Sequence, residues 1–425
     1  MHERYRRFFR LLAVSAVTSW AAAGCTEQVE TSTETTLSSM TYAAVAGDDA
    51  PELAHPGAYR VGVRTLRFVF DDAPDVSIAG HLASADTRWR RELSVDVLYP
   101  ADVAPDTPAD AVYEGNYQTG FAEIDGLPDR FEIRGYAVRD APVLANTSFP
   151  LVLVSHGLFN TPGVLSGLTE NLASKGYVVA AIDHRDAEDD PATPVHLFAR
   201  VLLNRALDQK RVLGELLTLA PGDAGGVRDA IDAERVALIG FSMGGYGVLA
   251  HAGAGFDPDG SAFTIVPAHT IADQTASSPV YRNEDRSHID AVIAFAPWGG
   301  KAGEVWTDEA LTGVTAPLLV FAGSEDDVSD YEHGIRRIFE QANGAERFML
   351  VFQNAQHNLV QVKAPPAAHL DVRSWMTFED ATWRRERLLN TGVHFATAFL
   401  DWHLKGHSDA RRFFDVPTVQ SNDAT

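Results

Sequence analysis

Short apolar runs rich in β-branched residues alternate along this chain with longer stretches of helical periodicity. Eight runs have the length and composition of strands, at residues 59–70, 93–99, 151–155, 177–183, 236–239, 291–296, 318–322 and 348–352. Helical stretches follow at residues 164–174, 196–219, from 243 onward and at 393–405. This alternation is typical of a largely parallel sheet with helices on both faces. The pattern therefore predicts one α/β domain built on a mostly parallel, eight-stranded sheet.

Three segments depart from the simple alternation. Polar and apolar residues alternate with a period of two over 93–99, so we expect this strand and 59–70 to be antiparallel. Residues 101–149 have the composition of a long loop, and residues 253–287 lack clear periodicity. The second of these segments is a candidate lid.

Composition and charge exclude several classes of function. The chain has 425 residues, of which 45% are hydrophobic and 22% charged, as in ordinary folded proteins. Its 58 acidic and 35 basic side chains give a formal net charge of −23, which would repel phosphate backbones, so no nucleic-acid partner is expected. Cys25 is the single cysteine, which rules out an intramolecular disulfide and a cysteine-ligated zinc.

The first 25 residues have the pattern of an export signal. Four arginines in the first ten residues precede an apolar run at 11–23 that is too short to span a bilayer. Cys25 follows Ala22-Ala23-Gly24, which resembles a bacterial lipobox and implies a lipid on the Cys25 sulfur. The alternative is ordinary cleavage with Cys25 unmodified. We therefore expect a membrane-anchored lipoprotein, or otherwise a periplasmic or secreted protein.

Composition also sets the expected boundaries of the folded domain. Residues 26–56 are rich in Thr, Ser, Glu and Asp, with few large apolar groups, and are expected to form a disordered acidic tether. Residues 57–415 then form the α/β domain, and residues 416–425 a C-terminal tail. The chain has no internal repeat and no later apolar run of about 20 residues.

A possible nucleophile lies where the strand at 236–239 ends. That strand runs into Gly240-Phe241-Ser242-Met243-Gly244, a G-x-S-x-G sequence. In a nucleophile elbow, a sharp turn between strand and helix lifts the serine hydroxyl above the sheet, and the glycines avoid collisions with neighbouring backbone. Ser242 is therefore the candidate nucleophile, with an ordinary glycine-rich turn as the alternative.

A serine hydroxyl needs a general base, and the base needs a carboxylate to orient it. In chains with this elbow on an α/β sheet, the order is serine, acid, histidine. Asp326 follows the strand at 318–322, and His357 follows the strand at 348–352. We expect Asp326 as the acid, with Glu325 and Asp327 as alternatives, and His357 as the base.

The loop after the strand at 151–155 contains candidate oxyanion donors. It reads His156-Gly157-Leu158-Phe159, and such a loop supplies one backbone amide while the residue after the nucleophile supplies another. We therefore expect the Leu158 and Met243 amides to form the oxyanion hole. His156 is expected to fix the turn rather than to transfer protons.

These motifs resemble a known superfamily. The sequences at 155–158, 172–181 and 183–186 are similar to those of platelet-activating factor acetylhydrolases. The chain resembles the α/β-hydrolase superfamily over about 59–405, and within it the platelet-activating factor acetylhydrolase and dienelactone hydrolase-like branch. The resemblance implies the α/β-hydrolase fold and a serine hydrolase with no cofactor and no metal. Dienelactone hydrolases use a cysteine nucleophile, which is absent here, and Phe159 stands where relatives often have glycine.

A second resemblance concerns the substrate side of the site. Ala296-Pro297-Trp298, after the strand at 291–296, is similar to a Pro-Trp of bacterial cutinase-like polyester hydrolases. That resemblance implies that Trp298 forms a wall of the substrate site, together with Phe159, and a buried core tryptophan is the alternative. The turn at 183–186 is expected to be ion-paired, with substrate contact as its alternative.

The sequence thus predicts an exported serine ester hydrolase that cleaves carboxylic esters of small molecules or lipids through an acyl-enzyme. The alternatives are an acetylhydrolase-like phospholipase, a polyester hydrolase, and a surface lipoprotein that binds ligands without turnover.

Overall fold

The computed structural model describes residues 40–43, 46–47, 49–74, 77–78, 81–82, 88–117, 127, 129–186 and 194–415. The expected signal at 1–25 with Cys25, the first part of the tether and the tail at 416–425 lie outside these residues. None of the described helices is long and apolar enough to cross a membrane.

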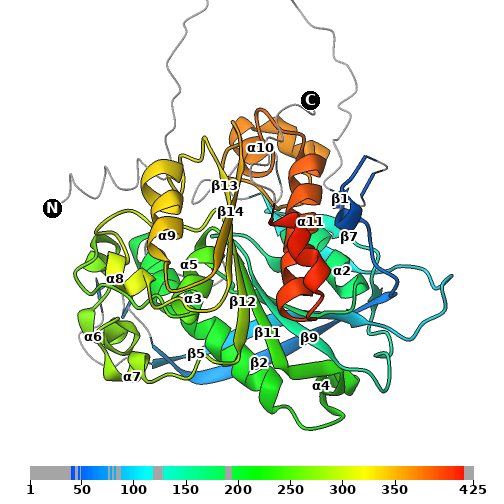
Figure 1. Cartoon of the computed structure of the whole chain (residues 1–425), viewed down its shortest axis with the longest axis horizontal. Coiled ribbons are helices and arrows are strands. Elements are labelled where there is room, and N and C mark those ends of the chain that lie inside the picture. Colours follow the sequence, from blue (N-terminus) through cyan, green and yellow to red (C-terminus); the bar gives the residue numbers. More distant parts are fainter. Residues whose placement is uncertain are drawn as a thin grey trace, which may run out of the picture.

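The main sheet has nine strands in the order β14-β13-β12-β11-β9-β10-β5-β2-β8 (Figure 1). Six strands form its parallel part: β9 (Phe149–Ser155), β10 (Val178–Asp183), β11 (Ile231–Phe241), β12 (Ile289–Phe295), β13 (Leu318–Gly323) and β14 (Arg347–Phe352). The remaining strands are β2 (Val61–Pro74), β5 (Arg88–Pro100) and β8 (Val138–Arg139). As expected, β5 pairs antiparallel with both β10 and β2. All eight predicted strands occur and the fold class is confirmed, while the two-residue β8 adds a ninth strand beside β2.

Helices cover both faces of this sheet. The longer ones are α2 (Ser166–Ser174), α3 (Pro194–Thr218), α5 (Met243–His251) and α11 (Arg385–His403). The shorter ones are α4 (Val227–Ala230), α6 (Ala268–Ile271), α7 (Pro279–Arg282), α8 (Asp308–Leu311), α9 (Arg336–Gln341) and α10 (Val372–Phe378). Helices α3 and α5 pack together on one face, and α2 and α11 on the other (Figure 1).

Single helical turns complete the connections. They are η1 (Glu52–Ala54), η2 (Pro162–Leu165), η3 (Asp223–Gly226), η4 (Ser261–Ile265), η5 (Ala272–Gln274), η6 (Tyr331–Ile335), η7 (Pro366–Leu370) and η8 (Ser408–Phe413).

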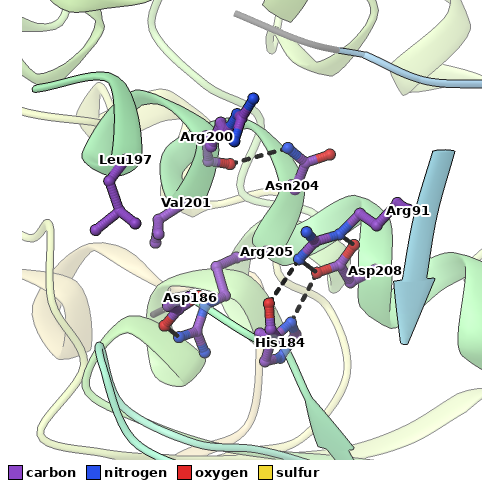
Figure 2. A pocket seen from close by; sticks show the side chains of 9 residues that line it. All are labelled: Arg91, His184, Asp186, Leu197, Arg200, Val201, Asn204, Arg205 and Asp208. Carbon is purple, nitrogen blue, oxygen red and sulfur yellow. Dashed lines mark hydrogen bonds and ion pairs between the residues drawn. The ribbon is translucent and has the colours of Figure 1, made fainter. Parts of the chain in front are cut away.

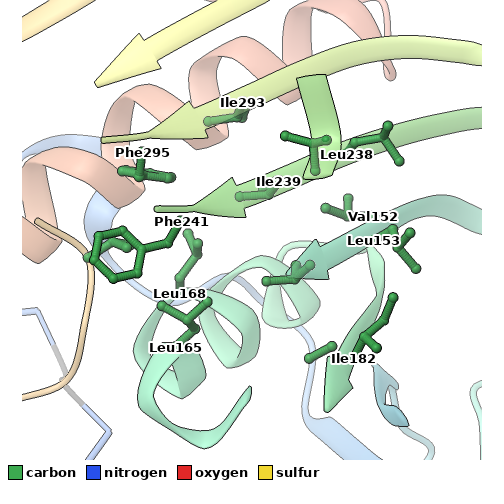
Figure 3. Close-up of a cluster of buried hydrophobic side chains, with 14 of the residues drawn as sticks. Val152, Leu153, Leu165, Leu168, Ile182, Leu238, Ile239, Phe241, Ile293 and Phe295 are labelled. Carbon is green, nitrogen blue, oxygen red and sulfur yellow. The ribbon is translucent and has the colours of Figure 1, made fainter. Parts of the chain in front are cut away.

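The core lies between the central strands and the two helical layers. Every residue of β9 is buried, which explains its continuous apolar sequence, because a strand covered on both faces needs no polar side. Figure 3 shows Leu165 and Leu168 packed under the strands that carry Val152, Ile239 and Phe295. Burial of this many apolar groups gives the strand ends fixed positions.

The segment 101–149, expected to be a loop, contains strands. Its β6 (Val112–Asn116) and β7 (Arg130–Arg134) pair antiparallel, and β1 (Met40–Tyr42) adds to β7 in parallel. A separate two-stranded ladder joins β3 (Ser77–Ile78) to β4 (His81–Leu82). Such short strands form by pairing with partners elsewhere in the chain, so their own composition signals them weakly.

The folded region also begins before the expected boundary at residue 57. Besides β1, the turn η1 packs against α11, where the Leu53 N–H donates to His394 Nδ1 at 3.1 Å. Asn171 Nδ2 donates to the Ala54 carbonyl at 2.7 Å, and Ala54 is 1% exposed. The described residues between 40 and 56 therefore contact the domain, because β1 pairs with β7 and side chains of α2 and α11 bind the main chain of η1.

The candidate lid at 253–287 packs against α3 and α5. Phe256 stacks on Tyr246 of α5 with ring centroids 5.4 Å apart, and Tyr281 donates a hydrogen bond to the Ala250 carbonyl. Gln274 Nε2 donates to the Leu203 carbonyl of α3 at 3.3 Å. The segment is therefore part of the helical layer on that face.

Candidate active site

Ser242 occupies a strained turn between β11 and α5. Its φ of 54° and ψ of −114° lie outside the regions that L-residues prefer. A Cβ on Gly240 would lie 2.2 Å from the Gly244 carbonyl oxygen, and a Cβ on Gly244 would lie 2.0 Å from that of Ser155. The two glycines of G-x-S-x-G are thus required by the close approach of backbone, as in a nucleophile elbow.

The structure brings Ser242 together with His357 and Asp326. His357 Nε2 lies 2.9 Å from Ser242 Oγ, and His357 Nδ1 lies 2.8 Å from Asp326 Oδ2. The three residues follow β11, β14 and β13, whose carboxyl ends share one edge of the sheet. The line of hydrogen bonds can move a proton from the serine hydroxyl to the imidazole.

The carboxylate of Asp326 is held in place by the main chain. Its Oδ1 accepts the N–H groups of Val328 and Ser329 at 3.0 and 2.9 Å, which leaves Oδ2 for His357. Asp326 is buried, whereas its neighbours Glu325 and Asp327 are exposed. Of the three carboxylates considered from the sequence, Asp326 is the one that binds the imidazole.

The loop with the expected oxyanion donor lies against the nucleophile. A Cβ on Gly157 would be 3.1 Å from the Phe241 ring and 3.5 Å from Ser242 Cβ, so the loop and the elbow are in close contact. Within the described part of the chain, no group accepts the Leu158 N–H. Met243 is the first residue of α5, where backbone N–H groups have no partner within the helix. Both amides are therefore suited to binding an oxyanion.

The two aromatic residues expected at the substrate side have different surroundings. Phe159 is half-buried and has a φ of 59°, in the left-handed region that favours glycine. Trp298 is 7% exposed and packs edge-on against Phe198 and Tyr246, with ring centroids 5.5 and 6.0 Å apart. The packing of Trp298 is that of a core residue, the alternative considered from the sequence. The backbone N–H of Trp298 donates to the Ser242 carbonyl at 3.2 Å, so this residue lies directly beside the elbow.

A second Ser-His-Asp arrangement lies inside the protein, and sequence reasoning missed it. Ser155 Oγ is 2.8 Å from His184 Nε2, and His184 Nδ1 is 2.8 Å from Asp208 Oδ2. Arg91 binds both oxygens of Asp208 at 2.7 and 2.6 Å (Figure 2). All three members of this set are 0% exposed, so an ester cannot reach Ser155 without rearrangement of the core.

The electrostatics of this buried set suit a structural role. Burial and the nearby Arg205 lower the pKa of His184 to about 4, so the imidazole is neutral at neutral pH. Burial would raise the pKa of Asp208, but Arg91 and the His184 hydrogen bond hold it at about 2. His156 contributes too, because its Nδ1 bonds the Gly157 carbonyl and its Nε2 accepts the His184 N–H at 3.1 Å. A sequence signal existed in Arg205 and Asp208, two charges three residues apart on the buried face of α3.

Among the described residues, no group of three or more His, Cys, Asp or Glu side chains is arranged to hold a metal ion.

The turn at 183–186 is ion-paired through Asp186 and Arg205, as expected.

Comparisons with known proteins show similarity to several ester hydrolases. The family model "Platelet-activating factor acetylhydrolase, isoform II" matches residues 131–195. The chain is 35% identical to cutinase est1 of Thermobifida alba, over 50% of this chain and 54% of the cutinase. It is 26% identical to the platelet-activating factor acetylhydrolase of Canis lupus familiaris, over 26% of this chain and 33% of that enzyme. The chain thus spans about half the length of the first cutinase and one third of the acetylhydrolase.

A solved structure shares the whole fold. The ferulic acid esterase from Streptomyces cinnamoneus superposes with a TM-score of 0.55 at 20% identity, covering 90% of this chain and 97% of that chain. Fold and sequence matches together show the α/β-hydrolase fold. Within that class the chain is related to the isoform II acetylhydrolase family and to the Thermobifida cutinases, and these homologues are serine ester hydrolases. The resemblance inferred from the sequence is thereby confirmed.

Proposed function

We propose that this protein is a serine ester hydrolase that cleaves carboxylic esters through an acyl-enzyme. The observation that carries the proposal is the continuous line of hydrogen bonds from Ser242 through His357 to Asp326. The line ends at the strained elbow, beside two backbone amides suited to an oxyanion. Relatives named as cutinases and acetylhydrolases support the same reaction class.

In the first half of the reaction, Ser242 Oγ attacks the ester carbonyl while His357 Nε2 takes the hydroxyl proton. The Leu158 and Met243 N–H groups bind the negative oxygen that develops, and Asp326 stabilises the imidazolium. The tetrahedral intermediate collapses when the bond from carbon to the leaving oxygen breaks. His357 donates its proton to that oxygen, and the alcohol leaves an acyl group on Ser242.

The second half repeats these steps with water. His357 Nε2 takes a proton from water, whose oxygen attacks the acyl carbon, and the bond to Ser242 Oγ then breaks. The proton returns to Ser242 and the carboxylic acid leaves. His357 accepts and returns each proton that moves, so the mechanism calls for no cofactor.

The proposed substrates are carboxylic esters of small molecules or lipids, with the half-buried Phe159 beside the acyl group. The test is hydrolysis of p-nitrophenyl esters of increasing acyl length by the purified protein and by Ser242→Ala. Turnover by the wild type that the variant lacks would support the proposal. Equal rates in the two proteins, or no turnover of any ester, would contradict it.

We also propose that the enzyme is exported and anchored by a lipid on Cys25, on the grounds of the basic and apolar pattern before that residue. Two or more acyl chains would hold it stably on a membrane, and the net charge of −23 gives no attraction to anionic lipids. In detergent phase separation of the protein expressed in bacteria, the wild type should enter the detergent phase and Cys25→Ala the aqueous phase. An unmodified mature N-terminus by intact mass would contradict the anchor.

A further inference from the structure

The main chain of the loop at 156–159 is held by side chains from three other parts of the fold. Arg205 of α3 donates to the His156 carbonyl at 2.5 Å and to the Gly157 carbonyl at 3.2 Å. Asp186, after β10, accepts the Phe159 N–H at 3.2 Å. Asn116 of β6 donates to the Phe159 carbonyl at 2.9 Å. Four main-chain groups on both sides of Leu158 are thus fixed from outside the loop.

These contacts are buried and connected to one another. Arg205 forms an ion pair with Asp186, and the two side chains point toward each other next to α3 (Figure 2). Arg205 is 1% exposed, and Asp186 and Asn116 are buried as well. In a site that excludes water, hydrogen bonds to charged groups are strong and directional. The planar guanidinium binds two carbonyls and a carboxylate through N–H groups in a fixed fork, and the single ammonium nitrogen of a lysine does not reproduce that geometry.

The loop needs such support because of its backbone conformation. Phe159 has a φ of 59°, which a residue with a side chain adopts only at a cost in free energy. Asp186 and Asn116 bind the N–H and the carbonyl of this same residue. They therefore stabilise the strained conformation directly. The Leu158 N–H shares a peptide plane with the Gly157 carbonyl, which Arg205 binds.

We propose that Arg205, Asp186 and Asn116 are positioning residues that hold the Leu158 amide toward the oxyanion of the ester reaction. This inference rests on the proposed function, since it assumes that Ser242 attacks a carbonyl next to this loop. The buried set of Ser155, His184 and Asp208 adjoins the same loop. Arg205 differs from that set because it binds the loop carbonyls directly.

The main test compares Arg205→Lys with Arg91→Lys. Both arginines are buried and paired with an aspartate on or next to α3, but the Arg91 hydrogen bonds go to Asp208 and the His184 carbonyl. Arg205→Lys should lower kcat by about tenfold to a hundredfold with KM within about threefold, since weakening one oxyanion donor acts on the transition state. Arg91→Lys should lower the melting temperature about as much as Arg205→Lys does, but leave kcat within about threefold.

A second measurement identifies the oxyanion as the affected group. The sulfur of a thionoester is a weaker hydrogen-bond acceptor than a carbonyl oxygen, so an intact oxyanion hole favours the oxygen ester. The ratio of kcat/KM for an oxygen ester to that for its thionoester should fall by about tenfold in Arg205→Lys and stay unchanged in Arg91→Lys. Loss of fold alone would lower both rates equally.

Asn116→Ala tests the proposal without leaving a buried charge unpaired. It should lower both kcat and the ester ratio by about threefold to tenfold while the protein stays folded. Unchanged ratios in Asn116→Ala and Arg205→Lys, with both proteins folded, would overturn the inference. Ser242→Ala in the same assay keeps the two proposals apart: if it removes turnover while the ratios stay unchanged, only the positioning role is lost.

Discussion

His357 Nε2 lies 2.9 Å from Ser242 Oγ, although the two residues are 115 positions apart in the chain. The two residues follow β11 and β14, which belong to the same parallel half of the sheet and are fixed by a shared core. Only small shifts are needed for a proton to pass between these atoms. Ser242 and His357 are 7% and 8% exposed, whereas Ser155 and His184 are fully buried, which favours Ser242 as the proposed nucleophile.

The choice among three acidic residues can be tested by two matched amides. Asp326→Asn keeps the shape of the side chain but favours the wrong tautomer of His357, so kcat should fall by about 10⁴-fold. Asp327→Asn changes an exposed neighbour and should stay within about threefold of the wild type. Steady-state kinetics on one p-nitrophenyl ester measures both, and a larger loss in Asp327→Asn would refute the assignment of Asp326.

The two serine-histidine pairs should respond differently to alanine. Ser242→Ala should remove turnover by several orders of magnitude with little change in stability. Ser155→Ala leaves a buried nitrogen of His184 without its partner, so the free energy of unfolding should fall by about 1–3 kcal/mol. Its kcat should remain within about tenfold, because Arg205 and Asp186 still bind the loop. If Ser155→Ala folds normally but is inactive, the assignment of the nucleophile is mistaken.

Two glycine-to-alanine changes, one in the elbow and one in α3, should have opposite effects on stability. At Gly244 a Cβ would lie 2.0 Å from a backbone oxygen, so Gly244→Ala should destabilise the protein by about 2 kcal/mol or more and reduce activity. At the exposed Gly214 in α3, no heavy atom lies within 4 Å of the position of a Cβ. Gly214→Ala should therefore stabilise the protein by about 0.5–1 kcal/mol. Thermal unfolding measures both, and equal shifts would argue against the close contact at Gly244.

Buried histidines make stability depend on pH in a defined direction. Burial lowers the pKa of His403 to about 4, so between pH 6.5 and 4 this side chain is protonated in the unfolded chain but not in the folded one. The unfolded state then binds more protons, and the contribution of His403 to stability is lost as the pH falls through this window. Glu170, whose pKa burial raises, acts in the opposite direction.

Comparison with His403→Gln isolates this histidine from the opposing carboxyl groups. Urea unfolding at pH 7.5 and pH 4.5 should show a smaller loss of stability in the variant than in the wild type. An equal or larger loss in the variant would mean that His403 keeps its charge in the folded protein.

The sequence was sufficient for the strands and for the residues at their carboxyl ends. A strand buried on both faces, such as β9, is a continuous apolar run. Ser242, Asp326 and His357 stand one, three and five residues after the ends of β11, β13 and β14. The order of strands in the sheet then brings these three side chains to one edge. The residues that meet at the site could therefore be named before their distances were known.

Features made by long-range pairing could not be predicted in this way. The strands β1, β6 and β7 are three to five residues long, and β1 finds its partner about 90 positions later in the chain. The support of the oxyanion loop joins Asn116, Asp186 and Arg205, which lie in three separate segments. No local periodicity marks such a set, because only the folded sheet and α3 bring its members together.

The most direct measurement of the central claim is the site of covalent modification by a fluorophosphonate, which reacts with an activated serine. After labelling of the folded protein and digestion, mass spectrometry should find the adduct on the peptide that carries Ser242, with the Ser155 peptide unmodified. The adduct should be absent from Ser242→Ala and strongly reduced in His357→Ala, since the imidazole activates the hydroxyl. An adduct on any other residue, or full ester turnover by a protein that is not labelled at Ser242, would contradict the account.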